Sequence, residues 1–67
     1  MDAMILEGKW KQMRGQVKEQ WGKLTNDDLD RIAGKRDMLI GTLEEKYGYA
    51  RQQAESEVNN FLESLKI

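Results

Sequence analysis

The chain has 67 residues, with 11 basic and 12 acidic side chains, a formal net charge of -1, and no cysteine, histidine or proline. A chain of this length forms at most one domain, residues 1–67, and it has neither a disulfide nor a thiolate or imidazole for metal binding or catalysis. The hydroxyl, lysine and carboxylate groups that remain rarely make an active site in so small a chain. We therefore expect no enzyme and no cofactor.

Hydrophobic residues make up 39% of the chain, charged residues make up 34%, and the mean hydropathy is -0.81. Low hydropathy favours disorder, whereas a net charge near zero and a regular apolar spacing favour a fold. We expect a marginally stable, folded, monomeric domain. No run of 18 apolar residues is present to span a membrane. Residues 1–7 lack the basic flank and long apolar stretch of a secretion signal, so a cytoplasmic location is expected.

A first helix is predicted between Gly8 and Gly22, since apolar residues recur there at steps of three and four. Leu6 and Leu24 extend this apolar stripe, and Gly22 is expected to end the helix in the left-handed conformation. The stripe consists of Trp10, Met13, Val17 and Trp21.

A short second helix is predicted to follow, because Thr25 is a good N-cap and Asp28 stands at the third helical position. Leu24 and Leu29 have the spacing of a hydrophobic staple. This helix is expected to end near Gly34. Its predicted buried residues are Leu29, Ile32 and Ala33.

A third helix is predicted from Lys35 to Tyr47, with Gly48 at its end, and a fourth from Ala50 onward. The inward residues of the third are Leu39, Ile40, Leu43 and Tyr47. Those of the fourth are Ala50, Ala54, Val58, Phe61, Leu62 and Leu65. No strand pattern occurs anywhere, so the sequence predicts an all-α fold, a compact array of four helices.

The six glycines form two sets with a seven-residue step, at positions 8, 15 and 22 and at 34, 41 and 48. An offset of 26 aligns residues 8–22 with residues 34–48 and makes five of the fifteen positions identical. This match indicates two duplicated helical hairpins, although chance also produces such matches in helical sequences. Gly15 and Gly41 fall inside helices. They reflect either tolerance at the surface or close approach of a neighbouring helix or a partner.

The charges are uneven along the chain. Between Gly8 and Lys23 there are five bases and one acid, a net of +4, whereas residues from Leu24 onward carry a net of -3. A basic row flanked by tryptophans can hold phosphates while the rings stack on bases. The competing interpretation is a solvated helix flank beside two core tryptophans, and a membrane-surface helix is a third. The candidate binding residues are Lys9, Lys11, Arg14, Lys18 and Lys23.

The acidic residues give little indication of a functional site. Asp27, Asp28 and Asp30 lie close together, but the ligand register of an EF-hand fails because Ala33 and Leu39 occupy the required glycine and glutamate positions. Helix capping explains these acids better. Ser64 has no histidine to activate it. We expect no metal site.

Residues 15–28, with the sequence GQVKEQWGKLTNDD, resemble the CsbD-like family of small bacterial proteins, whose members carry a similar G-x-V-K-E-x-W-G-K-L-T-x-D-D core. The likeness continues through residues 34–41, 45–49 and 54–58 and covers about Gly8 to Phe61. The termini depart from the family pattern. The resemblance implies a general-stress protein without established enzymatic activity and a SAM-domain-like array of helices.

Two functional hypotheses follow. The first is a non-enzymatic bacterial stress-response protein that acts by abundance and protection or by binding an unknown macromolecular partner. The second is a nucleic-acid-binding module that uses the basic first helix.

Overall fold

The computed structural model describes the backbone of residues 3–65 and the side chains of residues 9–65. It contains four helices: α1 (Ala3–Gln20), α2 (Asn26–Ile32), α3 (Arg36–Tyr47) and α4 (Arg51–Ser64). No strand occurs among the described residues. The all-α, four-helix prediction is therefore confirmed, and α1 begins earlier than the sequence indicated. The prediction that Leu6 extends the apolar stripe lies outside the described side chains.

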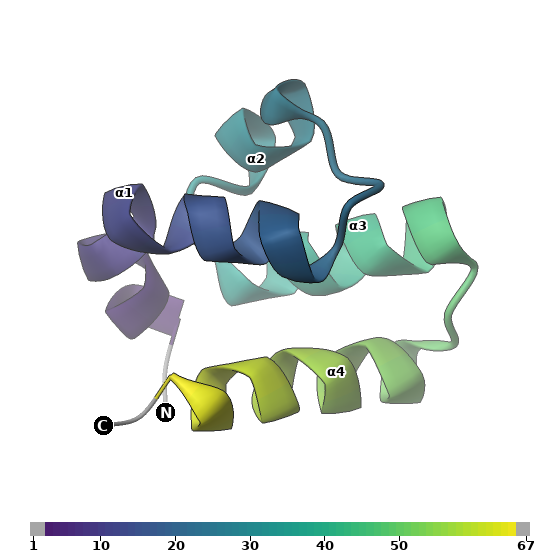
Figure 1. Ribbon diagram of the computed structural model, residues 1–67. Coiled ribbons are helices and arrows are strands. Elements are labelled where there is room, and N and C mark those ends of the chain that lie inside the picture. The colour runs from purple at the N-terminus through teal and green to yellow at the C-terminus, as the bar shows by residue number, and fades with distance from the viewer. Residues whose placement is uncertain (1–2, 66–67) are drawn as a thin grey trace.

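The central element is α3, because each of the other helices packs against it. Figure 1 shows α1 crossing in front of α3, α4 below it and the short α2 above it. The adjacent side chains of Leu39 and Ile40 are fully buried, as is Leu43 one turn later. These three positions cover a wide arc of the helix, which is why α3 can contact several neighbours at once.

One apolar core joins all four helices. Fully burying a large apolar side chain contributes about 1.5–3 kcal/mol, and the rings of Trp21 and Phe61 pack with centroids 5.0 Å apart at an interplanar angle of 57°. The fourteen core residues are Trp10, Met13, Val17, Trp21, Leu24, Leu29, Ile32, Leu39, Ile40, Leu43, Ala54, Val58, Phe61 and Leu62. Nearly all the predicted inward positions are thus confirmed, and Tyr47 and Leu65 are partly buried against this core.

Two predicted inward positions are wrong. Ala33 and Ala50 are both exposed. Ala33 follows the last residue of α2 and takes the left-handed conformation at φ 49°, so its side chain leaves the helical face that Ile32 occupies. Ala50 is the residue that precedes the first turn of α4, in an extended conformation. Both alanines therefore act at a helix boundary rather than in the core.

The helix ends follow local sequence signals at three of four predicted places. The capping box of α2 is present: the Asp28 N–H donates to Thr25 Oγ1 at 3.1 Å, and the Thr25 N–H donates to Asp28 Oδ2 at 2.9 Å. Gly34 and Gly48 have positive φ after α2 and α3. The left-handed stop predicted at Gly22 is wrong, since Gly22 has no positive φ and the chain leaves α1 through a turn closed by the Leu24 N–H and the Trp21 carbonyl.

The predicted equivalence of residues 8–22 and 34–48 holds for the core and fails at the helix ends. Met13 and Leu39 are both buried, as are Val17 and Leu43. Gly22 and Gly48, in contrast, differ in backbone conformation. Equivalent apolar positions therefore face one core, whether or not the repeat arose by duplication. The SAM-domain-like arrangement that the resemblance implied stays a prediction.

Candidate interaction surface

The basic side chains predicted to bind a partner lie along α1 and in the turn that follows it, and we call this set the basic flank. It comprises Lys9, Lys11, Arg14, Lys18 and Lys23. Lys11, Arg14 and Lys18 share one side of the helix, whereas Lys9 lies on the opposite side, near Ser64 and Leu65. Arg14 is half-buried and the four lysines are exposed. The structure therefore places them along one helix and its exit, but it gives them different surroundings.

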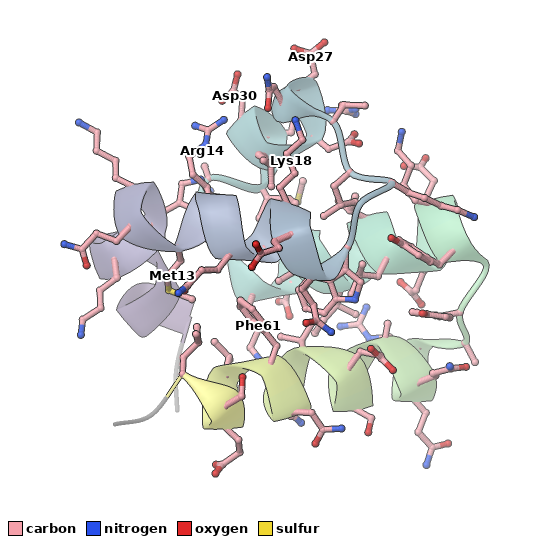
Figure 2. The ribbon with its side chains drawn as sticks, in the orientation of Figure 1. Met13, Arg14, Lys18, Asp27, Asp30 and Phe61 are labelled. Carbon is pink, nitrogen blue, oxygen red and sulfur yellow. The ribbon has the colours of Figure 1, made fainter. Side chains whose placement is uncertain are left out.

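Arg14 and Lys18 connect α1 to α2. Arg14 Nη2 lies 2.9 Å from Asp30 Oδ1, and Lys18 Nζ donates to Asn26 Oδ1 at 3.1 Å. Figure 2 shows both basic side chains directed at the upper helix, where Asp30 and Asp27 also lie. Surface ion pairs of this kind are worth about 0–1 kcal/mol each. Two members of the basic flank thus help to position α2, and Asp30 partly neutralises the charge of Arg14.

Lys23 belongs to a different cluster at the far end of α1. Its Nζ lies 5.1 Å from the centroid of the Tyr47 ring, and its backbone N–H donates to the Tyr47 hydroxyl at 3.1 Å. The rings of Tyr47 and Tyr49 stack with centroids 5.3 Å apart. Sequence reasoning did not find this cation–π contact. The one related feature of the sequence was the repeat, which aligns Tyr47 with Trp21 near Lys23.

Lys9 and Lys11 are the members of the basic flank that form no hydrogen bond or ion pair with any other residue whose side chain is described. Both side chains are exposed. These two lysines are therefore the part of the flank that is most available to an anionic partner.

The two tryptophans do not accompany these lysines at the surface. Trp10 is 8% exposed and Trp21 is 2% exposed, and both belong to the core. Met13 of the same helix and Phe61 of α4 face each other across that core in Figure 2. The interpretation of the tryptophans as core residues is confirmed, so any binding by the basic flank proceeds without an indole ring that stacks on a base.

A second feature is a groove of about 220 Å³ between α2 and α3. Its lining contains three acidic side chains and one basic side chain, together with the exposed side chain of Met38 and the open backbone of Gly41. The lining residues are Asp28, Arg31, Asp37, Met38, Gly41, Thr42 and Glu45. No pattern in the sequence indicated this groove, apart from the position of Gly41 inside a helix.

The buried carboxylate at the end of this groove is Asp28, which is 3% exposed. Its Oδ2 lies 3.2 Å from Lys46 Nζ of α3, and its Oδ1 lies 3.2 Å from Arg31 Nη2. The backbone N–H of Thr25 is the largest influence on the pKa of Asp28 and lowers it from the ordinary 3.8; Lys46 lowers it further, whereas burial opposes the shift. Asp28 therefore stays ionised and ties the start of α2 to α3.

The sequence predicted that the acidic residues serve in helix capping, and this role is observed at Asp28. No group of histidine, cysteine or acidic side chains within the described residues is arranged to hold a metal ion. No helix in the described part of the chain is long and apolar enough to cross a membrane. Ser64, the serine considered as a nucleophile, donates its hydroxyl to the Phe61 carbonyl at 2.7 Å.

Comparison with known proteins identifies relatives along most of the chain. The model of the family described as CsbD-like matches residues 5–56. The UPF0337 protein YjbJ of Escherichia coli strain K12 is 63% identical over 51 residues, which is 76% of this chain and 74% of that protein. The UPF0337 protein PA4738 of Pseudomonas aeruginosa is 45% identical over 65 residues, 97% of this chain and 100% of that protein. These matches confirm the resemblance found in the sequence.

Because the pKa of Asp28 is lowered in the folded state, the free energy of unfolding depends on pH in the acid range. Because the folded-state pKa lies below the unfolded one, the contribution of Asp28 is present above the unfolded value of about 3.9 and is lost as pH falls through the folded value. We expect Asp28→Asn to lower the thermal midpoint at pH 7 and to reduce the loss of stability on acidification. Thermal unfolding followed by circular dichroism from neutral pH to about pH 2 measures both effects.

Thr25→Ala is the matched control, since it removes the other half of the capping box without removing a charge. It should cost about 1 kcal/mol and shift the stability curve downward with little change in its shape. If Asp28→Asn and Thr25→Ala give curves of the same shape, the ionised carboxylate of Asp28 contributes nothing to folding.

Proposed function

The chain belongs to the CsbD-like family, and from that premise we propose that it is a non-enzymatic bacterial stress-response protein that acts in the cytoplasm through its abundance. In this role it protects other macromolecules and stays dissolved at high concentration. The family resemblance supplies the general stress response. The proposed mode of action depends on the surface and the composition of the chain.

The observation that carries this proposal is the character of the surface. Met38, at 44%, is the large hydrophobic side chain that is exposed among residues 9–65, and both tryptophans are in the core. Basic and acidic side chains together make up 34% of the chain, with the two signs almost balanced. A surface of mixed charges without a large apolar patch opposes aggregation when a protein accumulates.

The chemistry of the chain also supports a role without catalysis. The sequence has no cysteine that an oxidant could convert to a disulfide or sulfenic acid, and no histidine to act as a general base near neutral pH. Such a chain has no thiol to oxidise. This is a useful property for a protein that accumulates under stress.

Protection is tested by drying a labile enzyme in the presence of this protein and measuring the activity that returns on rehydration. We expect more activity to return than with an equal mass of lysozyme, because this chain covers the enzyme with charged, hydrated surface and offers little apolar surface for adsorption. Equal recovery with the two proteins would contradict the protective role.

A specific observation also favours a second candidate function, nucleic-acid binding by the basic flank. Lys9 and Lys11 are exposed and have no partner among the described side chains, while Arg14 and Lys18 lie along the same helix. Lys11, Arg14 and Lys18 share one side of α1, and cations on one side of a helix can contact neighbouring phosphates. Because the indole rings are in the core, such binding would be electrostatic and would show little preference for sequence.

Fluorescence anisotropy with short labelled DNA and RNA, at about 50 mM and about 200 mM salt, measures this activity. We expect affinity to fall about tenfold across that range and to fall further in Lys11→Glu. Lys35→Glu carries the same change in net charge at another exposed lysine and should retain most of the binding. Equal losses in the two variants, or no binding at low salt, would exclude a site on α1.

A further inference from the structure

The residues that flank the two mid-helix glycines carry charges of opposite sign. At the offset of 26 residues, Gly15 corresponds to Gly41, Lys11 to Asp37, and Lys18 to Glu44. In each helix the charged residues stand four positions before and three positions after the glycine. At 100° per residue, all three members of each set lie within one narrow arc of the helix. We call these sets the basic glycine face of α1 and the acidic glycine face of α3.

Neither glycine is required by packing inside the molecule. A Cβ atom added at Gly15 or at Gly41 would meet no neighbouring atom within 4 Å, and neither residue has a positive φ. A glycine inside a helix costs about 1 kcal/mol relative to alanine. Open space around both glycines leaves room for a helix backbone from outside to approach closely.

The groove beside the acidic glycine face suits a lysine side chain. Met38 supplies an exposed apolar wall, and Asp37 and Glu45 supply carboxylates at the same opening. Lysine commonly lays its aliphatic stem on apolar surface and keeps its ammonium group near charge or water. A volume of about 220 Å³ is that of a side-chain pocket rather than of a helix-binding groove.

We propose that the basic glycine face of one molecule docks against the acidic glycine face of a second copy of this chain. Gly15 of one molecule lies opposite Gly41 of the other, which lets the two helices cross at close range. Lys11 and Lys18 then meet Asp37, Glu44 and Glu45, and one lysine enters the groove beside Met38. The inference rests on charge complementarity and open helix faces, and it does not depend on the proposed protective function.

The two faces lie on different helices of the same molecule, so the contact is heterologous. A molecule that uses its α1 still presents a free α3, and association can continue beyond a dimer. The ion pairs are exposed and individually weak, so the complex forms only at high protein concentration. Glu19 is an acid near the basic glycine face and opposes the contact. Glu19→Lys should therefore strengthen it.

Sedimentation velocity of the full chain, from about 10 μM to about 1 mM, tests the proposal. At about 50 mM salt, we expect the weight-average sedimentation coefficient to rise with concentration, and at about 500 mM salt the rise should largely disappear as the charges are screened. A monomer throughout the concentration range at low salt would overturn the proposal. A rise that salt does not reduce would also overturn it.

Glycine substitutions separate this contact from general charge attraction. Gly41→Gln and Gly15→Gln leave the net charge unchanged and place a long polar side chain where the helices should cross, so both should abolish the concentration-dependent rise. Gly22→Gln is the control, because Gly22 also has open space around it and no positive φ but lies outside both faces. Circular dichroism confirms that each variant is folded. Association retained in Gly41→Gln and Gly15→Gln would contradict the crossing.

Charge reversal tests the pairing itself. The variant Lys11→Glu/Lys18→Glu has two acidic faces, and Asp37→Lys/Glu44→Lys has two basic faces, so each alone should stay monomeric. An equal mixture should associate again. Replacing the second variant in that mixture by Gly15→Gln/Glu55→Lys/Glu57→Lys, which has the same net charge but a blocked basic glycine face, should give no comparable association. Equal association in the two mixtures would show attraction by net charge alone and would overturn the proposed faces.

Discussion

The burial of the apolar stripe of α1 is the constraint on which the rest of this structure depends. With 67 residues and no disulfide, the chain has one small core to offset the entropy of folding. Trp10 and Trp21 are the largest side chains available to that core, and both are within it. Withdrawing either ring to bind a ligand would expose the surface of α3 and α4 that it covers. The functional surface of α1 is therefore what the stripe leaves free, a flank of charged side chains around an open glycine.

That flank is also part of the electrostatic organisation of the fold. The basic segment that contains α1 faces acidic groups of α2, and Arg14 and Asp30 join the two helices at the surface. Asp28 makes the corresponding connection from α2 to α3 through Lys46. The short α2 is thus held from two sides by charge and by its buried leucine and isoleucine. Lys9 and Lys11 on α1 and Glu44 and Glu45 on α3 are among the charges that have no partner within residues 9–65, and they are available for recognition.

The features that could be predicted from sequence are those determined by nearby residues. The capping box of Thr25 and Asp28 needs only a spacing of three, and the inward positions of α3 and α4 follow from helical periodicity. The Arg14–Asp30 and Lys23–Tyr47 contacts could not be predicted, because they join residues 16 and 24 positions apart through the tertiary packing. The predicted left-handed end of α1 at Gly22 was wrong for a related reason. Its exit is set by the packing of Trp21 and Leu24 in the core, so Gly22 need not adopt a left-handed conformation.

The accessibility of the two tryptophans tests this account most directly. Their fluorescence should be shifted to the blue relative to free tryptophan and should resist quenching by acrylamide and iodide, with Trp10 measured in Trp21→Phe and Trp21 measured in Trp10→Phe. Adding DNA or RNA should leave the emission of both residues unchanged. A red-shifted Trp10 that is readily quenched, and that becomes protected when nucleic acid is added, would contradict the claim that the apolar stripe of α1 belongs to the core.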